Sequence, residues 1–182
     1  MNITYFVHGT TVDNELGLST GWYDTELSKL GIKQSRELKK LIKGKRFDIV
    51  YCSDLKRAVD SANLTFGDTV KIIQDIRLRE VNYGDLTRTK SEEIDSSILE
   101  HIDKPFPNGE SYKDVEKRIR SFLDDLIKNY SGKNVAIVAH RAPQLALDVL
   151  LKRKTWEQTV NEDWRIKKPP EWKPGWEYKL ER

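Results

Sequence analysis

The chain has 182 residues, and its 32 Lys and Arg against 29 Asp and Glu give a formal net charge of +3. Hydrophobic residues make up 37% and charged residues 34%, which is typical of a globular protein with a highly charged surface. So small a positive excess gives no reason to expect nucleic-acid binding, which usually comes with a concentrated basic stripe. No segment approaches the length of a membrane span, so we expect no membrane contact.

The single cysteine, Cys52, has no partner for an internal disulfide, and nothing points to an oxidising compartment. It lies in an apolar run, so we expect a buried, inert thiol. The first residues read as a strand rather than a signal peptide, and we predict a cytoplasmic protein. The length favours one domain over residues 1–182, with a Trp-rich C-terminal tail from about residue 156. Whether the chain forms a homodimer stays open.

Apolar runs alternate with amphipathic stretches along most of the chain. The apolar runs predict strands at 3–7, 47–52, 70–73 and 134–139. Helical spacing of apolar residues predicts helices at 28–42, 54–66, 111–130 and 142–151, with a weaker helix at 91–102. Ser53 or Asp54 is expected to cap the helix at 54–66, and His101, which lies in no motif, is expected on the surface. The segments 13–25 and 78–89 read as irregular. This alternation indicates a three-layer α/β fold, in which a mostly parallel central sheet carries helices on both faces.

Polar groups follow each predicted strand. His8 follows the first, Arg57 comes shortly after the second, Glu80 lies in the loop after the third, and His140 follows the fourth. Ligands of such sheets bind beyond the carboxyl ends of the strands, where these groups should meet. An imidazole can attack phosphorus, an arginine can bind the non-bridging oxygens through two parallel hydrogen bonds, and a protonated carboxyl group can protonate a leaving alkoxide. The set suits phosphoryl transfer.

The same residues lie in a series of motifs. In chain order they are Phe6-Val7-His8-Gly9-Thr10-Thr11, Gly21-Trp22-Tyr23-Asp24-Thr25-Glu26-Leu27, Ser53-Asp54-Leu55-Lys56-Arg57-Ala58, Leu78-Arg79-Glu80-Val81-Asn82-Tyr83-Gly84, Gly109-Glu110-Ser111 and Val138-Ala139-His140. Each motif alone would be weak. Together and in this order they resemble the histidine phosphatase superfamily, also called the phosphoglycerate mutase-like family.

The resemblance implies roles for these residues. His8 would be the nucleophile that forms a phosphohistidine, and Glu80 the general acid that later activates water. Arg57 and His140 would hold the phosphoryl oxygens, with help from Asn14. The further candidates for phosphate binding are Thr11, Gly21 and Arg141. The resemblance implies no metal or organic cofactor, and it implies a phosphoric monoester hydrolase of the histidine acid phosphatase type that acts on a small phosphorylated metabolite.

One departure from the family pattern concerns the phosphate site itself. The family has arginine immediately before the first histidine, and this chain has Val7. The second histidine motif usually continues His-Gly, whereas here it is His140-Arg141. Two interpretations of Arg141 stay open: its guanidinium replaces the lost charge, or it points to solvent or to an acidic neighbour.

Three functions are compatible with the sequence. A phosphatase is favoured, because mutases of this family carry Glu-Arg-His-Tyr-Gly where this chain has Glu80-Val-Asn-Tyr-Gly84, and they have longer insertions that keep water from the phosphohistidine. A mutase is the second, and a non-catalytic phosphate sensor, supported only by Val7, is the third.

The sequence does not name the substrate. The family sets specificity in the loops at 10–14 and 86–97 and in the tail. The tryptophans of the tail, at positions 156, 164, 172 and 176, either pack on the core or roof the pocket. Residues 175–180 predict an added edge strand with Glu177 and Lys179 pointing outward.

Overall fold

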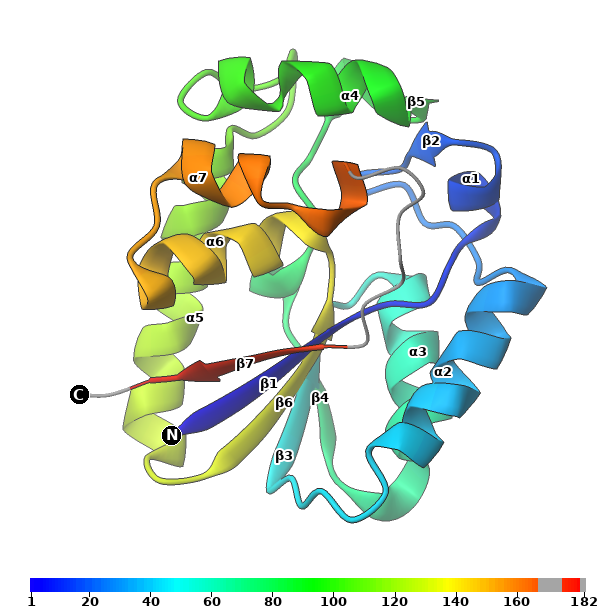
Figure 1. Cartoon of the computed structure of the whole chain (residues 1–182), viewed down its shortest axis with the longest axis vertical. Helices are drawn as coiled ribbons and strands as arrows, with labels where there is room; N and C mark the ends of the chain where they lie inside the picture. Colours follow the sequence, from blue (N-terminus) through cyan, green and yellow to red (C-terminus); the bar gives the residue numbers. More distant parts are fainter. Residues whose placement is uncertain (167–174, 181–182) are drawn as a thin grey trace.

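A central sheet runs through the computed structural model, which describes residues 1–166 and 175–180 (Figure 1). In this part of the chain the sheet has the strand order β4-β3-β6-β1-β7. Its strands are β1 (Asn2–Val7), β3 (Ile49–Cys52), β4 (Ile72–Gln74), β6 (Asn134–Ala139) and β7 (Trp176–Lys179). All neighbouring pairs are parallel except β1 and β7. The predicted mostly parallel sheet is confirmed.

Helices cover both faces of the sheet. α2 (Lys29–Leu41) and α3 (Lys56–Phe66) lie on one face, and α5 (Tyr112–Tyr130) and α6 (Arg141–Lys152) lie on the other (Figure 1). Side chains of a strand alternate between faces. In β1, Ile3 and Tyr5 therefore join the cluster that includes α5 and α6, while Phe6 packs with Leu38 of α2 and Phe66 of α3. The described residues thus form three layers.

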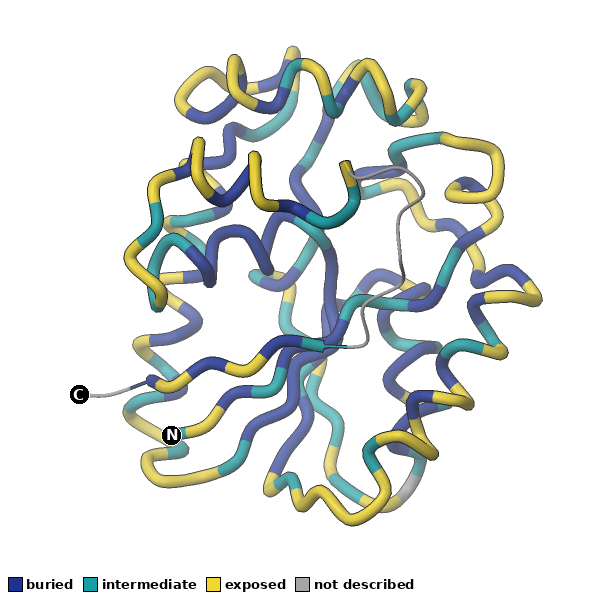
Figure 2. Tube along the Cα trace, in the orientation of Figure 1, coloured by how far each residue is buried: buried dark blue, intermediate teal, exposed yellow. Residues whose placement is uncertain are grey.

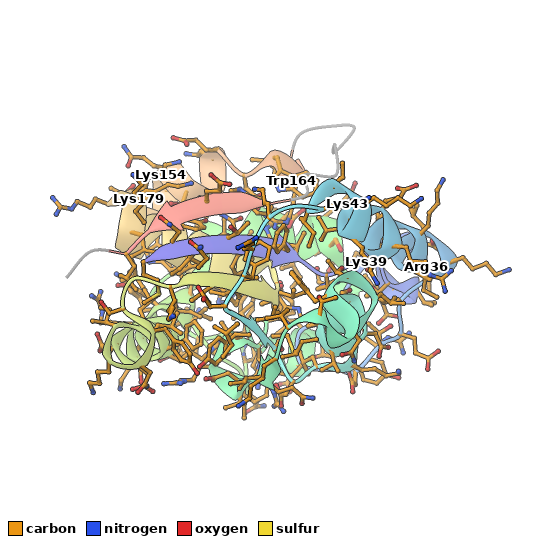
Figure 3. All side chains as sticks on the ribbon, turned by 90° about the horizontal axis from the view of Figure 1, so that it is seen from below. Arg36, Lys39, Lys43, Lys154, Trp164 and Lys179 are labelled. Atoms are coloured by element: carbon orange, nitrogen blue, oxygen red, sulfur yellow. The ribbon has the colours of Figure 1, made fainter. Side chains whose placement is uncertain are left out.

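Burial follows these layers. The inner strands are almost wholly buried, whereas the helices expose one side (Figure 2). Arg36 on α2 points away from the sheet (Figure 3). Cys52 is fully buried as predicted, and burial raises the pKa of its thiol to about 12. Within residues 1–166 and 175–180, no helix combines the length and the hydrophobicity that crossing a membrane requires.

Shorter elements connect the layers. They are α1 (Val12–Glu15), β2 (Leu18–Ser19), η1 (Gly67–Thr69), η2 (Ile76–Leu78), η3 (Gly84–Leu86), β5 (Thr89–Lys90), α4 (Ser91–Ser97), η4 (Ile98–His101), α7 (Trp156–Asn161) and η5 (Trp164–Ile166). β2 pairs with β5 in a separate antiparallel ribbon. This ribbon, α4 and η5 lie beyond the carboxyl ends of the parallel strands, where the candidate site is found (Figure 1).

Several local expectations need correction. α3 begins at Lys56 after Leu55, which caps it without a side-chain bond. Asp54, a predicted cap, instead forms an ion pair with Arg79 at 2.6 Å. His101, predicted on the surface, is buried and its ring stacks on Phe106 with 3.8 Å between centroids. Phe106 therefore covers the face of the imidazole that water would contact if His101 lay on the surface.

The tail adds the edge strand that the sequence predicts. β7 pairs antiparallel with β1, its residues Glu177 and Lys179 are exposed, and Trp176 and Tyr178 are buried. Trp156 is buried in the core. The predicted contribution of position 172 lies outside the described residues. The tail therefore adds a strand beside β1, which is the strand that leads to His8.

Candidate active site

A pocket of about 480 Å³ opens at the carboxyl ends of the strands. Its walls come from Val7, His8, Thr10, Asn14, Ser19, Thr20, Gly21, Leu30, Gln34, Arg57, Glu80, Tyr83, Ser91, Asp95, Arg141, Trp164 and Arg165. We call the strand-end group His8, Arg57, Glu80 and His140 the floor; of these, His140 is fully buried beside His8 and is not among the residues of the pocket wall. We call the group Asp95, Arg141, Asp163, Trp164 and Arg165, which comes from α4, the start of α6 and the tail, the roof.

The orientation of the His8 ring is fixed by backbone. Its Nδ1 lies 2.7 Å from the Gly9 carbonyl oxygen. A carbonyl oxygen can only accept a hydrogen bond, so Nδ1 carries the proton and Nε2 keeps a free lone pair. Burial, and next the positive charge of Arg57, lower the pKa of His8 to about 3. The ring is therefore neutral near pH 7, as a nucleophile must be.

The turn after His8 depends on two glycines. A Cβ on Gly9 would lie 2.4 Å from the Gly31 carbonyl oxygen, and a Cβ on Gly31 would lie 2.0 Å from the Thr10 carbonyl oxygen. The backbone after β1 therefore packs directly on the first turn of α2. This contact fixes the direction in which His8 leaves the sheet.

His140 faces His8. The two rings have centroids 5.0 Å apart. His140 is fully buried, and neither ring nitrogen has a hydrogen-bond partner within the described residues. Burial, then Arg57 and His8, lower the pKa of His140 well below its usual value. Because buried polar groups are nearly always hydrogen-bonded, an unpartnered imidazole beside His8 indicates a ligand position.

Arg57 supplies the positive charge of the floor. Its Nη2 donates to the Gly21 carbonyl oxygen at 2.7 Å and its Nη1 to the Tyr23 carbonyl oxygen at 3.0 Å. Among the residues that the structure describes, no carboxylate forms an ion pair with it. Gly21, which was predicted to bind phosphate, thus holds the arginine through its carbonyl oxygen. Its φ of +57° lies in the left-handed region that favours glycine. The charge of Arg57 is thus available to an anion.

Glu80 lies at the N-terminus of α6. Its Oε1 accepts from the amides of Val81 at 3.0 Å and Ala142 at 2.9 Å, and its Oε2 accepts from the Arg141 amide at 3.0 Å. Trp22 Nε1 donates to the Glu80 carbonyl oxygen at 2.6 Å. The carboxylate therefore has a fixed place in the pocket wall.

The Gly-Glu-Ser turn supports the loop that carries Glu80. Glu110 accepts from the Asn82 amide at 2.9 Å and from Arg118 Nε at 3.1 Å, and Arg118 Nη2 donates to the Glu80 carbonyl oxygen at 3.0 Å. Motifs that are 30 residues apart in the chain thus meet behind the acid.

Asn14 and Thr11 form the cap of α1. Thr11 Oγ1 accepts from the Asn14 amide and Asn14 Oδ1 from the Thr11 amide, both at 3.0 Å. Asn14 lines the pocket, but Thr11 is fully buried and it is Thr10 that reaches the wall. The Thr11 hydroxyl therefore serves the helix cap.

Ion pairs hold the roof. Arg141 Nε donates to Asp163 Oδ2 at 2.6 Å, and its Nη1 forms a short ion pair with Asp95. Arg165 Nη1 donates to Asp163 Oδ1 at 2.8 Å and to Gln144 Oε1 at 3.2 Å. Burial would raise the pKa of Asp163, but Arg165 and Arg141 together lower it below its usual value. Arg141 thus lines the pocket and also binds acidic neighbours.

A comparison with family models gives one match that spans most of the chain. The model of the histidine phosphatase superfamily (branch 1) matches residues 5–168. The chain belongs to this superfamily. This result confirms the resemblance but corrects one expectation, because histidine acid phosphatases form a different family from the one matched here.

Relatives of this chain carry both phosphatase and mutase names. A Hydrogenobacter thermophilus protein named "Putative phosphoserine phosphatase 2" is 32% identical over 79% of this chain and 75% of its own length. A Methylorubrum extorquens protein named 2,3-bisphosphoglycerate-dependent phosphoglycerate mutase is 31% identical over 81% of this chain and 77% of its own length. At the level of the superfamily, phosphatase and mutase activities are both represented.

Solved structures agree with the fold. The α-ribazole phosphatase of Shigella flexneri has a TM-score of 0.78 and 26% identity, covering 88% of this chain and 84% of the other. A mycobacterial glucosyl-3-phosphoglycerate phosphatase, solved with VO3, has a TM-score of 0.77 and 27% identity, covering 88% and 86%.

Sequence reasoning missed three charged residues at the pocket. Asp95 and Arg165 line the pocket, and Asp163 binds Arg141 and Arg165 behind them; none of the three belongs to a motif, and they meet only in the folded chain. The loop at 86–97 and the tail were expected to shape specificity, and both do contribute to the pocket wall. The tryptophans of the tail were expected either to pack on the core or to roof the pocket. Trp164 lines the pocket, whereas Trp156 packs on the core.

Proposed function

We propose that this protein hydrolyses a small phosphomonoester, a phosphorylated metabolite, by way of a phosphohistidine at Nε2 of His8. One observation carries the proposal: the Gly9 carbonyl oxygen, 2.7 Å from Nδ1, keeps the proton on that nitrogen and leaves Nε2 free. A nucleophile held in one tautomer by a neighbouring group needs no proton removed before it attacks. Location in the cytoplasm stays a prediction.

In the first step, Nε2 of His8 forms a bond to phosphorus as the bond from phosphorus to the ester oxygen breaks. Arg57, which no described carboxylate neutralises, binds the non-bridging oxygens, and the unpartnered ring of His140 donates to them when it carries a proton on the facing nitrogen. Glu80, in its protonated form, gives its proton to the departing alkoxide. The alcohol leaves and a phosphohistidine remains.

In the second step, water attacks the phosphohistidine. Glu80, now a carboxylate, accepts a proton from the attacking water, the bond between phosphorus and Nε2 breaks, and inorganic phosphate forms. Three backbone amides hold this carboxylate through both steps, so it need not move between its two tasks. The cycle returns His8 to its starting tautomer.

A mutase is the second candidate, and the relative from Methylorubrum extorquens supports it. In a mutase the phosphoryl group of His8 would return to a second hydroxyl of the substrate instead of passing to water. The segment after Glu80 favours hydrolysis, because Val81 and Asn82 stand where mutases of the family carry Arg and His.

Phosphate release from p-nitrophenyl phosphate and from a panel of sugar phosphates, phosphoglycerates and nucleotides tests the proposal. We expect release by the wild type and a loss of at least about 1000-fold in His8→Ala. Arg120→Ala, which removes only an exposed ion pair with Glu116, is the control and should keep full activity. An active His8→Ala protein would contradict the proposal. Interconversion of phosphoglycerates faster than phosphate release would favour the mutase.

A further inference from the structure

The position before His8 decides how many arginines reach the phosphate. Val7 lies on the same face of β1 as Ile3 and Tyr5, because alternate residues of a strand share a face. An arginine at position 7 would therefore extend over the α5 and α6 side of the sheet toward the pocket, which Val7 lines. The valine leaves that side of the phosphate site without a charge from β1.

Arg165 lies on this face of β1. Its Cζ is 5.5 Å from the ring centroid of Trp176, and that ring packs edge-on against Tyr5 with 6.3 Å between centroids. Its Nη1 bonds Gln144 of α6. Arg165 and Val7 both line the pocket. The guanidinium thus comes from the tail into the region that a side chain at position 7 would enter.

Arg165 also keeps one donor for a ligand. Nη1 is used by Asp163 and Gln144, but Nη2 is buried and has no hydrogen-bond partner within the described residues. A buried guanidinium nitrogen without an acceptor is costly, and an anion in the pocket would remove that cost. The positive charge of Arg165 is also among the causes that lower the pKa of His8, after burial and Arg57, which agrees with its place near the nucleophile.

Arg141 differs in its surroundings. Asp163 and Asp95 occupy its Nε and Nη1 and offset its charge, and its Nη2 is buried without a partner in the described part of the chain. Arg141 therefore connects α6 to α4 and to the tail.

We infer that Arg165 binds the phosphoryl oxygens in place of the arginine that Val7 replaces, while Arg141 fastens the roof that positions it. The inference rests on the proposed function, since it assigns a residue to the same phosphate. Asp163 is then the positioning residue that holds Arg165 against the pocket. The substrate phosphate would lie between Arg57 on the floor and Arg165 on the roof.

The test compares Arg165→Ala, Arg165→Lys and Arg141→Ala, each with and without Val7→Arg, and uses Arg120→Ala as the control. The readouts are kcat/KM for p-nitrophenyl phosphate and the Kd of orthovanadate. Orthovanadate mimics phosphate, and the similar mycobacterial phosphatase was solved with VO3. We expect Arg165→Ala to lower kcat/KM about 100-fold and to weaken vanadate binding, as loss of one preorganised donor does. Arg165→Lys should recover little, because an ammonium lacks the planar fork.

Rescue separates phosphate binding from a structural role. Val7→Arg should restore at least about tenfold of kcat/KM and vanadate affinity in Arg165→Ala, because it returns a guanidinium to the same region. It should restore nothing in Arg141→Ala, whose defect would be a loosened roof. Normal activity and vanadate binding in Arg165→Ala would overturn the inference. It would also be overturned if Val7→Arg rescued Arg141→Ala but not Arg165→Ala. If the wild type releases no phosphate, the proposed function fails too, whereas His8-dependent release with a normal Arg165→Ala sinks only the inference.

Discussion

The floor and the roof of the pocket are held in different ways. On the floor, backbone groups fix every side chain except that of His140: the Gly9 carbonyl oxygen binds His8, the Gly21 and Tyr23 carbonyl oxygens bind Arg57, and three amides bind Glu80. In the roof, side chains hold side chains, through the ion pairs of Asp95 and Asp163 with two arginines. The geometry of the floor therefore follows largely from the backbone, whereas the roof needs four charged side chains to meet.

The floor and the roof also differ in how far their charges are neutralised. Arg57 has no carboxylate partner among the described residues, so its charge acts on whatever enters the pocket. The two arginines and two aspartates of the roof carry no net charge together, and only their unpartnered Nη2 atoms remain as donors. We therefore expect substitutions on the floor to affect chemistry most, and substitutions in the roof to affect how well the phosphate is positioned.

The largest effect in this comparison should come from Glu80→Gln on the floor. An alkoxide needs a proton as it departs, so we expect the rate for an alkyl phosphate to fall on the order of 1000-fold. p-Nitrophenolate leaves without help, so its phosphate ester should lose much less. Rates for the two substrates measure the difference, with the exposed Glu93→Gln as control. Equal losses for both substrates would mean that Glu80 is not the proton donor.

An intermediate effect should come from Asp163→Asn in the roof. The change removes the charge that holds both Arg141 and Arg165, and a small displacement of a phosphate-binding group costs rate. We expect kcat/KM to fall roughly tenfold. Asp95→Asn is the matched control, because it releases only Arg141, and its effect should be smaller. If Asp95→Asn has the larger effect, Arg141 rather than Arg165 matters for the phosphate.

The smallest effect should be a pH dependence of stability that comes from the floor. The pKa of folded His8 is about 3 against 6.5 for the unconstrained side chain, and that of His140 is also lowered. The unfolded chain therefore binds more protons below pH 6.5, and the free energy of unfolding should fall as the pH drops from 6.5 toward 3.

The roof contributes with the same sign, but at a lower pH. The pKa of Asp163 is lowered, so its stabilising contribution persists until the pH falls below the ordinary range of a carboxyl group. Denaturant unfolding of the wild type and of His8→Gln at several pH values measures the part that belongs to the floor. The variant should lose less stability between pH 6.5 and 4 than the wild type. Equal slopes would mean that His8 titrates normally.

The sequence predicts the floor well because each of its residues follows a strand. The apolar run at 134–139 matches β6, and the chain after it places His140 beside His8. It cannot predict the roof, because nothing local to Asp163 and Arg165 shows that Arg141 lies between Asp163 and Asp95. The cap of α3 was mispredicted for a similar reason: Asp54 is bound by Arg79, a residue distant in the chain.

Trapping of the phosphoenzyme tests the central claim most directly. The protein is mixed with a phosphomonoester, quenched in alkali, in which phosphohistidine survives, and digested for mass spectrometry of its peptides. We predict one added phosphoryl group, located on His8, in the wild type and none in His8→Ala. A phosphoryl group on any other residue, or turnover of the substrate with no phosphorylated His8, would contradict the claim.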